Sequence, residues 1–205
     1  MHRARETAPC MLAIAFRRVL CYDLNDLRGK DGDTVEYNDI YNENGQLTGR
    51  VHRRGTPWHH GEYGLVVCVW VYDGSGNVLL TRRAKGKSFA GTWENSGGAA
   101  KAGETSRQAI ARDLFEETGI RAEEGEFEYL CSDKDSHTLY DFYCLKRTVP
   151  LEQIVLLPSE TDGAKWASFP QVHDMIRKGN ICRIIAHQFL RQEQALKDRQ
   201  NTQDK

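Results

Sequence analysis

The chain has 205 residues, 40% of them hydrophobic, with 28 basic and 29 acidic side chains that give a formal net charge of −1. This length suits one domain with a good core, since a domain of about 150 residues already buries roughly 70% of the surface that its unfolded chain exposes. Charges of both signs are interspersed, which argues against a nucleic-acid or membrane-surface protein and favours a small-molecule partner.

The six cysteines are scattered, with no CxxC pair and no regular spacing, which argues against a zinc knuckle and a disulfide framework. Such cysteines are typical of buried thiols, and we expect a cytoplasmic protein. No apolar run reaches the roughly 18 residues that span a bilayer. The apolar stretch 10–16 is followed at once by arginines instead of the small residues of a signal-peptide cleavage site.

The beginning of the chain, residues 1–32, has no clear hydrophobic period and ends in a turn-like run of glycines and charges. We interpret it as a poorly ordered extension. Residues 33–196 would form the folded domain, and residues 197–205 a polar C-terminal tail.

A β-hairpin is predicted at the start of the domain, because β-type runs at 35–41 and 46–52 flank the strong turn Asn42-Glu43-Asn44-Gly45. The run 63–72 is nearly continuous in hydrophobicity, which is typical of a central strand covered on both faces. A glycine-containing turn then leads into a further strand at 78–83.

Basic residues follow this strand closely, namely Arg82, Arg83, Lys85 and Lys87. A loop here can place cations near an acidic site, or it can be a solvated basic loop, and the residues alone leave both readings open. The stretch 93–98 comes next. It predicts a short strand running into glycines, whose backbone can approach a ligand closely.

A helix is predicted at about 105–118, since Thr105 with Gln108 forms a capping-box pattern and Gly119 is typical of a left-handed helix end. At about 100° per residue, its acidic side chains fall on one face and its apolar residues on the other. Neighbouring carboxylates repel each other, so a cation or an arginine is expected to neutralise them, although a solvated acidic face is the alternative. Magnesium prefers such oxygen ligands.

The rest of the chain predicts strands at 126–131, 138–144 and 165–168. Ser168 with Gln171 begins a helix that ends near Lys178, and Asn180 would cap a last one. Strands that alternate with helices favour an α/β fold arranged as a three-layer sandwich.

The glycine-rich turn and the acidic helix together resemble the signature of the Nudix hydrolases, Gx5Ex7REUxEExGU, in which U is a bulky aliphatic residue. Eight of its nine specified positions match, namely Gly98, Glu104, Arg112, Leu114, Glu116, Glu117, Gly119 and Ile120. The departure is Asp113, where the family has glutamate. The N-terminal hairpin is similar to that of the branch related to isopentenyl-diphosphate isomerase. The implied fold is the Nudix α/β/α sandwich with a mixed sheet and this hairpin as an extension.

The resemblance also implies roles for individual residues. Mg²⁺, or Mn²⁺ as an alternative, would bind the carbonyl of Gly97 and the carboxylates of Asp113, Glu116 and Glu117. Arg112 would hold a carboxylate by a bidentate contact, and Glu104 would support the site as a nearby acid. Phosphate contacts would come from Arg82, Arg83 and Lys87, and Glu160 is our candidate for a catalytic acid outside the signature.

The expected function is therefore a Mg²⁺-dependent pyrophosphohydrolase of a nucleoside diphosphate derivative or a related small diphosphate, in which a homodimer is left open. Because Asp113 is one methylene shorter than glutamate, a weakly active or non-catalytic binding module is the alternative. An isopentenyl-diphosphate isomerase is a weaker one, since Gly97 and Ala99 stand where that chemistry needs a cysteine and a histidine.

Overall fold

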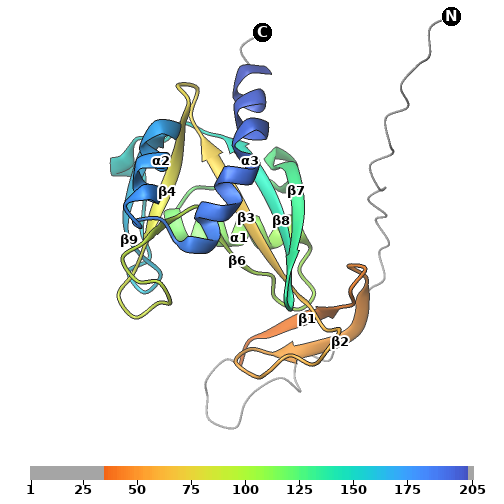
Figure 1. The fold of residues 1–205 in the computed structure, drawn as a ribbon. Coiled ribbons are helices and arrows are strands. Elements are labelled where there is room, and N and C mark those ends of the chain that lie inside the picture. Colours follow the sequence, from red (N-terminus) through yellow and green to blue (C-terminus); the bar gives the residue numbers. More distant parts are fainter. Residues whose placement is uncertain (1–34, 203–205) are drawn as a thin grey trace, which may run out of the picture. The chain divides into compact units, whose positions relative to one another are not determined.

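The computed structural model describes residues 35–202, shown in colour in Figure 1. The extension expected over residues 1–32 lies outside the described residues. The strands are β1 (Tyr37–Tyr41), β2 (Leu47–Arg53), β3 (Gly64–Tyr72), β4 (Asn77–Arg83), β5 (Trp93–Glu94), β6 (Ser96–Ala99), β7 (Glu128–Asp135), β8 (Thr138–Lys146) and β9 (Thr161–Ser168). The helices are α1 (Ser106–Thr118), α2 (Phe169–Arg177) and α3 (Arg183–Thr202), with short 3-10 turns η2 (Glu124–Glu126) and η3 (Leu151–Gln153).

Seven strands form one mixed sheet in the order β5-β4-β3-β8-β7, with β6 paired to β3 and β9 paired to β4. The pairing of β3 with β8 is parallel and the others are antiparallel. Strand β3 lies in the middle, and its almost continuous apolar sequence is buried on both faces, as predicted.

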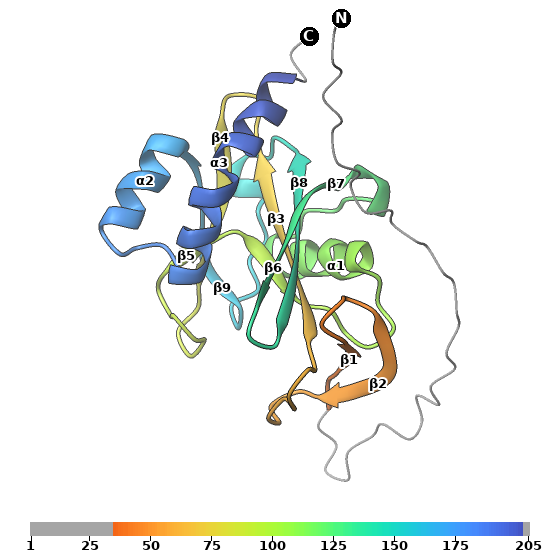
Figure 2. The same cartoon turned by 45° about the vertical axis from the view of Figure 1, so that its right-hand side comes forward.

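The sheet separates two hydrophobic clusters. Val67, Val69 and Val71 of β3 face α1, whereas Trp70 and Tyr72 face α2 and α3. This alternation follows from the two-residue period of a strand. Figures 1 and 2 show α1 on one side of the sheet and the other two helices on the opposite side, which confirms the α/β/α sandwich. No helix of the described part is long and apolar enough to cross a membrane.

The predicted hairpin is formed by β1 and β2, which make a separate two-stranded sheet. It is fastened to the loop before α1. The amide of Asn38 donates to the carbonyl of Ala100 at 2.7 Å, and Asp39 accepts from the backbone of Gly103 at 2.8 Å. The hairpin therefore helps to position the loop from which α1 begins.

The C-terminal helix differs from the prediction at both ends. Trp93 exchanges backbone hydrogen bonds with Asn180 and Cys182, each of 2.8 Å, so these residues extend along β5 and α3 begins only at Arg183. At the other end, α3 continues through residues 197–202, which the sequence assigns to a tail. Burial of Leu196 and a 2.7 Å contact from Arg199 to Glu128 of β7 hold these turns to the sheet.

Candidate active site

Two glycines of β6 bring the backbone close to its neighbours. In the strand register Gly97 lies opposite Cys68 of β3, and a Cβ added to Gly97 would come within 2.2 Å of the carbonyl oxygen of Val67. A Cβ at Gly98 would lie 2.9 Å from a carboxylate oxygen of Asp113. Neither position has room for a side chain, so this strand and the acidic helix pack directly against each other.

The ends of α1 are fixed as the sequence predicts. Thr105 and Gln108 form a reciprocal capping box, and Gly119 adopts a left-handed conformation with φ of 72°. Ile110 and Leu114 are buried against the sheet, which orients the acidic face of the helix towards β6 and the preceding loop. Local sequence signals thus determine where the signature carboxylates lie.

Arg112 is the hub of this acidic face. Its Nε and Nη2 donate to the two oxygens of Glu104 at 2.6 and 2.8 Å, which is a bidentate contact. Its Nη1 donates to Asp113 and, at 3.3 Å, to Glu116. One guanidinium therefore holds three carboxylates in fixed positions around it.

Burial raises the pKa values of the carboxylic acids around Arg112, whereas hydrogen bonds from Arg112 lower them. Burial alone would raise the pKa of Glu104, but hydrogen bonds from Arg112 and from the Lys101 amide outweigh it and lower the pKa. For Asp113 burial prevails over the attraction of Arg112, and with repulsion from Glu116 it raises the pKa to about 6. Asp113 thus binds its proton more strongly than an ordinary aspartate does.

Glu117 lies beside the glycine strand, close to both Glu94 and Asp113. Its burial, with repulsion from Glu94 and Asp113, raises its pKa well above the usual value, although hydrogen bonds from Ser96 and the Gly97 amide act in the other direction. Glu94 is itself buried in β5, which raises its pKa, while both its oxygens accept from Nη1 of Arg83 at 2.7 and 2.6 Å.

Sequence reasoning assigned no role to Glu94. Its burial depends on pairing with Thr81 of β4, thirteen positions earlier in the chain, which no local pattern predicts. A glutamate directly before the glycine-rich turn is the only local signal, and it is a weak one.

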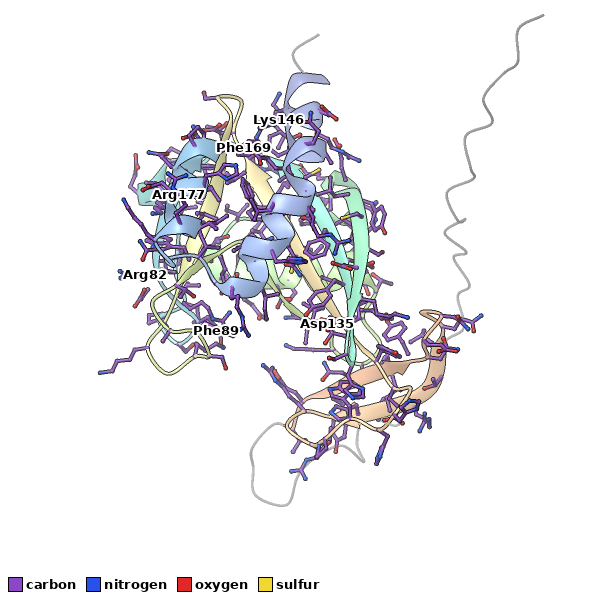
Figure 3. All side chains as sticks on the ribbon, viewed as in Figure 1. Arg82, Phe89, Asp135, Lys146, Phe169 and Arg177 are labelled. Atoms are coloured by element: carbon purple, nitrogen blue, oxygen red, sulfur yellow. The ribbon has the colours of Figure 1, made fainter. Side chains whose placement is uncertain are left out.

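The basic residues predicted to bind phosphate are all engaged with carboxylates. Arg83 pairs with Glu94 as described, and Lys87 pairs with Glu160. Arg82, labelled in Figure 3, contacts Asp162 at 2.6 Å. The structure therefore brings Lys87 and Glu160 together in one ion pair, and both act electrostatically on Glu94.

The donor set suits a hard divalent cation in its chemistry. Asp113 Oδ2 and Glu117 Oε2 are buried and have no hydrogen-bond partner in the described part of the chain. Carboxylate and carbonyl oxygens are the ligands that magnesium prefers, and a cation would relieve the repulsion between these groups. Among residues 35–202, however, no three His, Cys, Asp or Glu side chains converge closely enough to hold an ion. Glu116 remains 44% exposed beside Arg112.

Comparison with known proteins gives consistent matches. A family model described as the NUDIX domain matches residues 62–184. An uncharacterized Nudix hydrolase of Listeria monocytogenes is 30% identical over 156 residues, which are 75% of this chain and 90% of that protein. A shorter match is an isopentenyl-diphosphate Delta-isomerase of Leifsonia xyli, 42% identical over 71 residues that are 34% of this chain and 36% of the isomerase.

Solved structures share the fold. A Deinococcus radiodurans protein superposes with a TM-score of 0.65 at 21% identity, over 77% of this chain and 99% of that one. A bifunctional NMN adenylyltransferase/ADP ribose pyrophosphatase of Francisella tularensis, solved with AMP and a Mn ion, has a TM-score of 0.55 at 18% identity, over 69% of this chain and 43% of that one.

Proposed function

This chain belongs to the Nudix hydrolase family, enzymes that act on phosphoric anhydride bonds, and we propose that it cleaves the diphosphate linkage of a nucleoside diphosphate derivative or a related small diphosphate with Mg²⁺. The observation that carries the proposal is the acidic cluster beside Gly97, in which two buried carboxylate oxygens have no hydrogen-bond partner within residues 35–202. The structural relative solved with AMP and a Mn ion supports a nucleotide substrate and leaves Mn²⁺ as an alternative.

The residues that would hold the cation are Asp113, Glu116, Glu117 and the carbonyl of Gly97. When bound, a divalent cation neutralises phosphate oxygens and lowers the pKa of a coordinated water. Arg112 holds Glu104 and Asp113 in place before any ligand arrives, whereas Glu116 would have to leave Arg112 to reach the cation. Glu104 fixes the orientation of Arg112 through the bidentate contact.

The basic residues at the end of β4 and in the loop after it would bind the phosphates, and Glu160 would act on the attacking water. A phosphate oxygen can replace a carboxylate as the partner of Arg83, Lys87 or Arg82. We propose Glu160 as the acid outside the signature, because its contact with Lys87 keeps a carboxylate and an ammonium together near Glu94. Released from Lys87 by a phosphate, Glu160 would accept the proton of the water.

The shorter Asp113 still reaches the glycine strand, since its carboxylate lies against Gly98. This contact supports Asp113 as a ligand of the cation, which hydrolysis requires and which a non-catalytic binding module would share. The isomerase alternative has no such support, because neither Gly97 nor Ala99 carries a side chain that can transfer a proton.

Hydrolysis of a panel of nucleoside and other small diphosphates, with Mg²⁺ and with chelator, tests the proposal. We expect Mg²⁺-dependent turnover by the natural protein and a loss of about a hundredfold or more in Glu117→Gln, because the cation site loses a charge. The exposed Glu124→Gln is the matched control and should keep full activity. Mg²⁺ binding without turnover of any compound would refute the hydrolase and favour the binding module.

A further inference from the structure

Glu94 and Arg83 form an ion pair beside the acidic cluster. Glu94 is only 9% exposed, and both its oxygens accept hydrogen bonds from Nη1 of Arg83 at 2.7 and 2.6 Å. The neighbouring arginine has other partners, since Arg82 contacts Asp162 and lies 5.7 Å from the centre of the Trp93 ring. The buried carboxylate of Glu94 therefore holds Arg83 alone, and Glu94 is not part of the Nudix signature.

Arg83 also holds the loop that joins β4 to β5. Its Nε donates a hydrogen bond to the carbonyl oxygen of Ser88, in the middle of this loop. Its backbone closes the end of the loop, because the Arg83 amide donates to the carbonyl of Thr92 at 3.0 Å and the Gly91 amide donates to the carbonyl of Arg83 at 2.9 Å. Side chain and backbone of one residue thus fix residues 84–92.

A strained residue lies directly after the contact with Ser88. Phe89, labelled in Figure 3, is 45% exposed and has a φ of 58°, a left-handed conformation that bulky residues rarely adopt. Such a conformation persists only where surrounding contacts hold it. The contacts here are the hydrogen bond from Arg83 to Ser88 and one of 2.7 Å from Thr92 Oγ1 to the carbonyl of Phe89. The conformation of the loop therefore depends on the placement of the Arg83 guanidinium.

One nitrogen of this guanidinium is left for a ligand. Nε donates to Ser88 and Nη1 donates to Glu94, whereas Nη2 of Arg83 donates no hydrogen bond within residues 35–202. The guanidinium is planar and rigid, so the two held nitrogens also fix the position of Nη2 and its two N–H groups. A phosphate oxygen can therefore accept a hydrogen bond from Nη2 while Arg83 keeps both of its partners.

The ion pair also connects the two parts of the proposed site. Glu94 repels Glu117, a proposed ligand of the cation, and attracts Lys87, which lies in the same loop as Ser88. Lys87 in turn pairs with Glu160. A change at Glu94 is therefore expected to act on the basic loop through Arg83, and on Glu117 only through charge.

We propose that Glu94 is a positioning residue, which holds Arg83 so that Nη2 binds a phosphate oxygen of the substrate and the loop keeps Lys87 in place. Glu94 itself contacts neither the cation nor the substrate. The inference rests on the proposed function and adds a second arginine–glutamate pair to it. Glu104 fixes Arg112 on the acidic helix, and Glu94 fixes Arg83 beside the basic loop.

Calorimetric titration with methylenediphosphonate, a non-hydrolysable diphosphate, tests the inference in the presence of Mg²⁺. We expect Glu94→Gln and Arg83→Gln each to weaken binding by about tenfold, because charge-assisted hydrogen bonds are lost. The double variant should bind no more weakly than Arg83→Gln alone, since Glu94 acts through Arg83.

Two further measurements separate positioning from other roles of Glu94. In Glu94→Gln, the affinity for Mg²⁺ alone should not fall, because Glu94 is not a ligand and its repulsion of Glu117 is removed. In steady-state hydrolysis, KM should rise and kcat should change little, because the lost phosphate contact is made in the ground state as well as in the transition state.

The matched control is Glu126→Gln, which removes the charge from another arginine–glutamate pair, in which Arg147 Nη2 donates at 2.6 Å. Its affinity for the diphosphonate should be unchanged. If Glu94→Gln does not fold, Glu94→Asp, with a carboxylate one methylene shorter, should show the same loss. The inference would be overturned by an unchanged affinity in a folded Glu94 variant, by losses that add in the double variant, by a fall in Mg²⁺ affinity, or by a natural protein that does not bind the diphosphonate. Binding as expected but without turnover of any diphosphate would refute the proposed hydrolysis and leave the positioning role standing.

Discussion

Helices α1 and α3 cover opposite faces of the central strand β3, and their polar side chains differ in their hydrogen bonding. On α1, Arg112 donates hydrogen bonds to three carboxylates, so one positive charge is shared among three acidic side chains. At the beginning of α3, Arg183, His187 and the Gln188 oxygen have no partner among residues 35–202. The comparison teaches that an arginine of the same helix holds carboxylates of α1 in place, whereas no side-chain hydrogen bond within residues 35–202 holds these polar groups of α3.

Replacing the hub of α1 should have the largest effect. Arg112→Lys keeps the charge but loses the planar fork that holds Glu104, so the acidic face should become disordered. We expect Mg²⁺-dependent hydrolysis to fall by about a hundredfold, since misplacement by about 1 Å can cost that much in rate. Steady-state kinetics measure this.

The control for this change is Arg121→Lys, because Arg121 stacks over the Phe115 ring at 4.1 Å without touching the carboxylates. Its activity should remain near that of the natural protein. An Arg112→Lys variant with unchanged kinetics would show that the acidic face does not depend on the bidentate contact between Arg112 and Glu104.

The raised pKa of Asp113 predicts how the metal-free protein responds to pH. Because the folded-state pKa of about 6 exceeds the ordinary 3.8, the stabilising contribution is present below pH 4 and is lost as pH rises through 6. The loss for this group is about 3 kcal/mol. Urea unfolding in chelator, at intervals from pH 4 to 7, measures it.

Asp113→Asn should show a flatter dependence of unfolding free energy over the same range, because one of the titrating groups is gone. Glu94 and Glu117 have raised pKa values as well, so part of the slope should remain. An identical dependence of unfolding free energy on pH in the variant would show that the pKa of Asp113 is not raised in the folded protein.

Two buried glutamines of α3, Gln188 and Gln192, differ in their hydrogen bonding. We expect replacing them to change the unfolding free energy by a smaller amount. Gln192→Leu leaves the buried Trp70 indole without an acceptor, so we expect a loss of about 1–2 kcal/mol in unfolding free energy. Gln188→Leu removes an oxygen that has no hydrogen-bond partner in the described part of the chain, so it should be neutral or slightly stabilising. Urea midpoints of the two variants at neutral pH make the measurement, and equal losses would contradict the difference between the two sites.

Local signals in the sequence were sufficient for the elements around the signature. The capping box at Thr105, the left-handed Gly119 and the apolar run of β3 all act over a few residues, and the structure agrees with each. The alternation of strands and helices was likewise enough to predict the three-layer sandwich.

What sequence reasoning missed depends on contacts between distant segments. Glu94 becomes buried because β5 pairs with β4, and Lys87 meets Glu160 across 73 positions of the chain. The start of α3 moves to Arg183 because the preceding residues pair with Trp93. These partners are far apart in the sequence, and no local pattern reveals them. The basic residues could therefore be identified from the sequence, but not the carboxylates with which they pair.

The segment that matches the family model is shorter than the folded unit to which the β1–β2 hairpin belongs. The family model begins at residue 62, yet Asn38 and Asp39 fasten the loop that leads into the signature helix. The family model ends at residue 184, so it does not include Gln192, which accepts a hydrogen bond from the indole of Trp70 in the central strand. A fragment trimmed to residues 62–184 would keep the signature but lose the hydrogen bonds made by Asn38, Asp39 and Gln192, so the segment that matches the family and the compact unit of this chain have different boundaries.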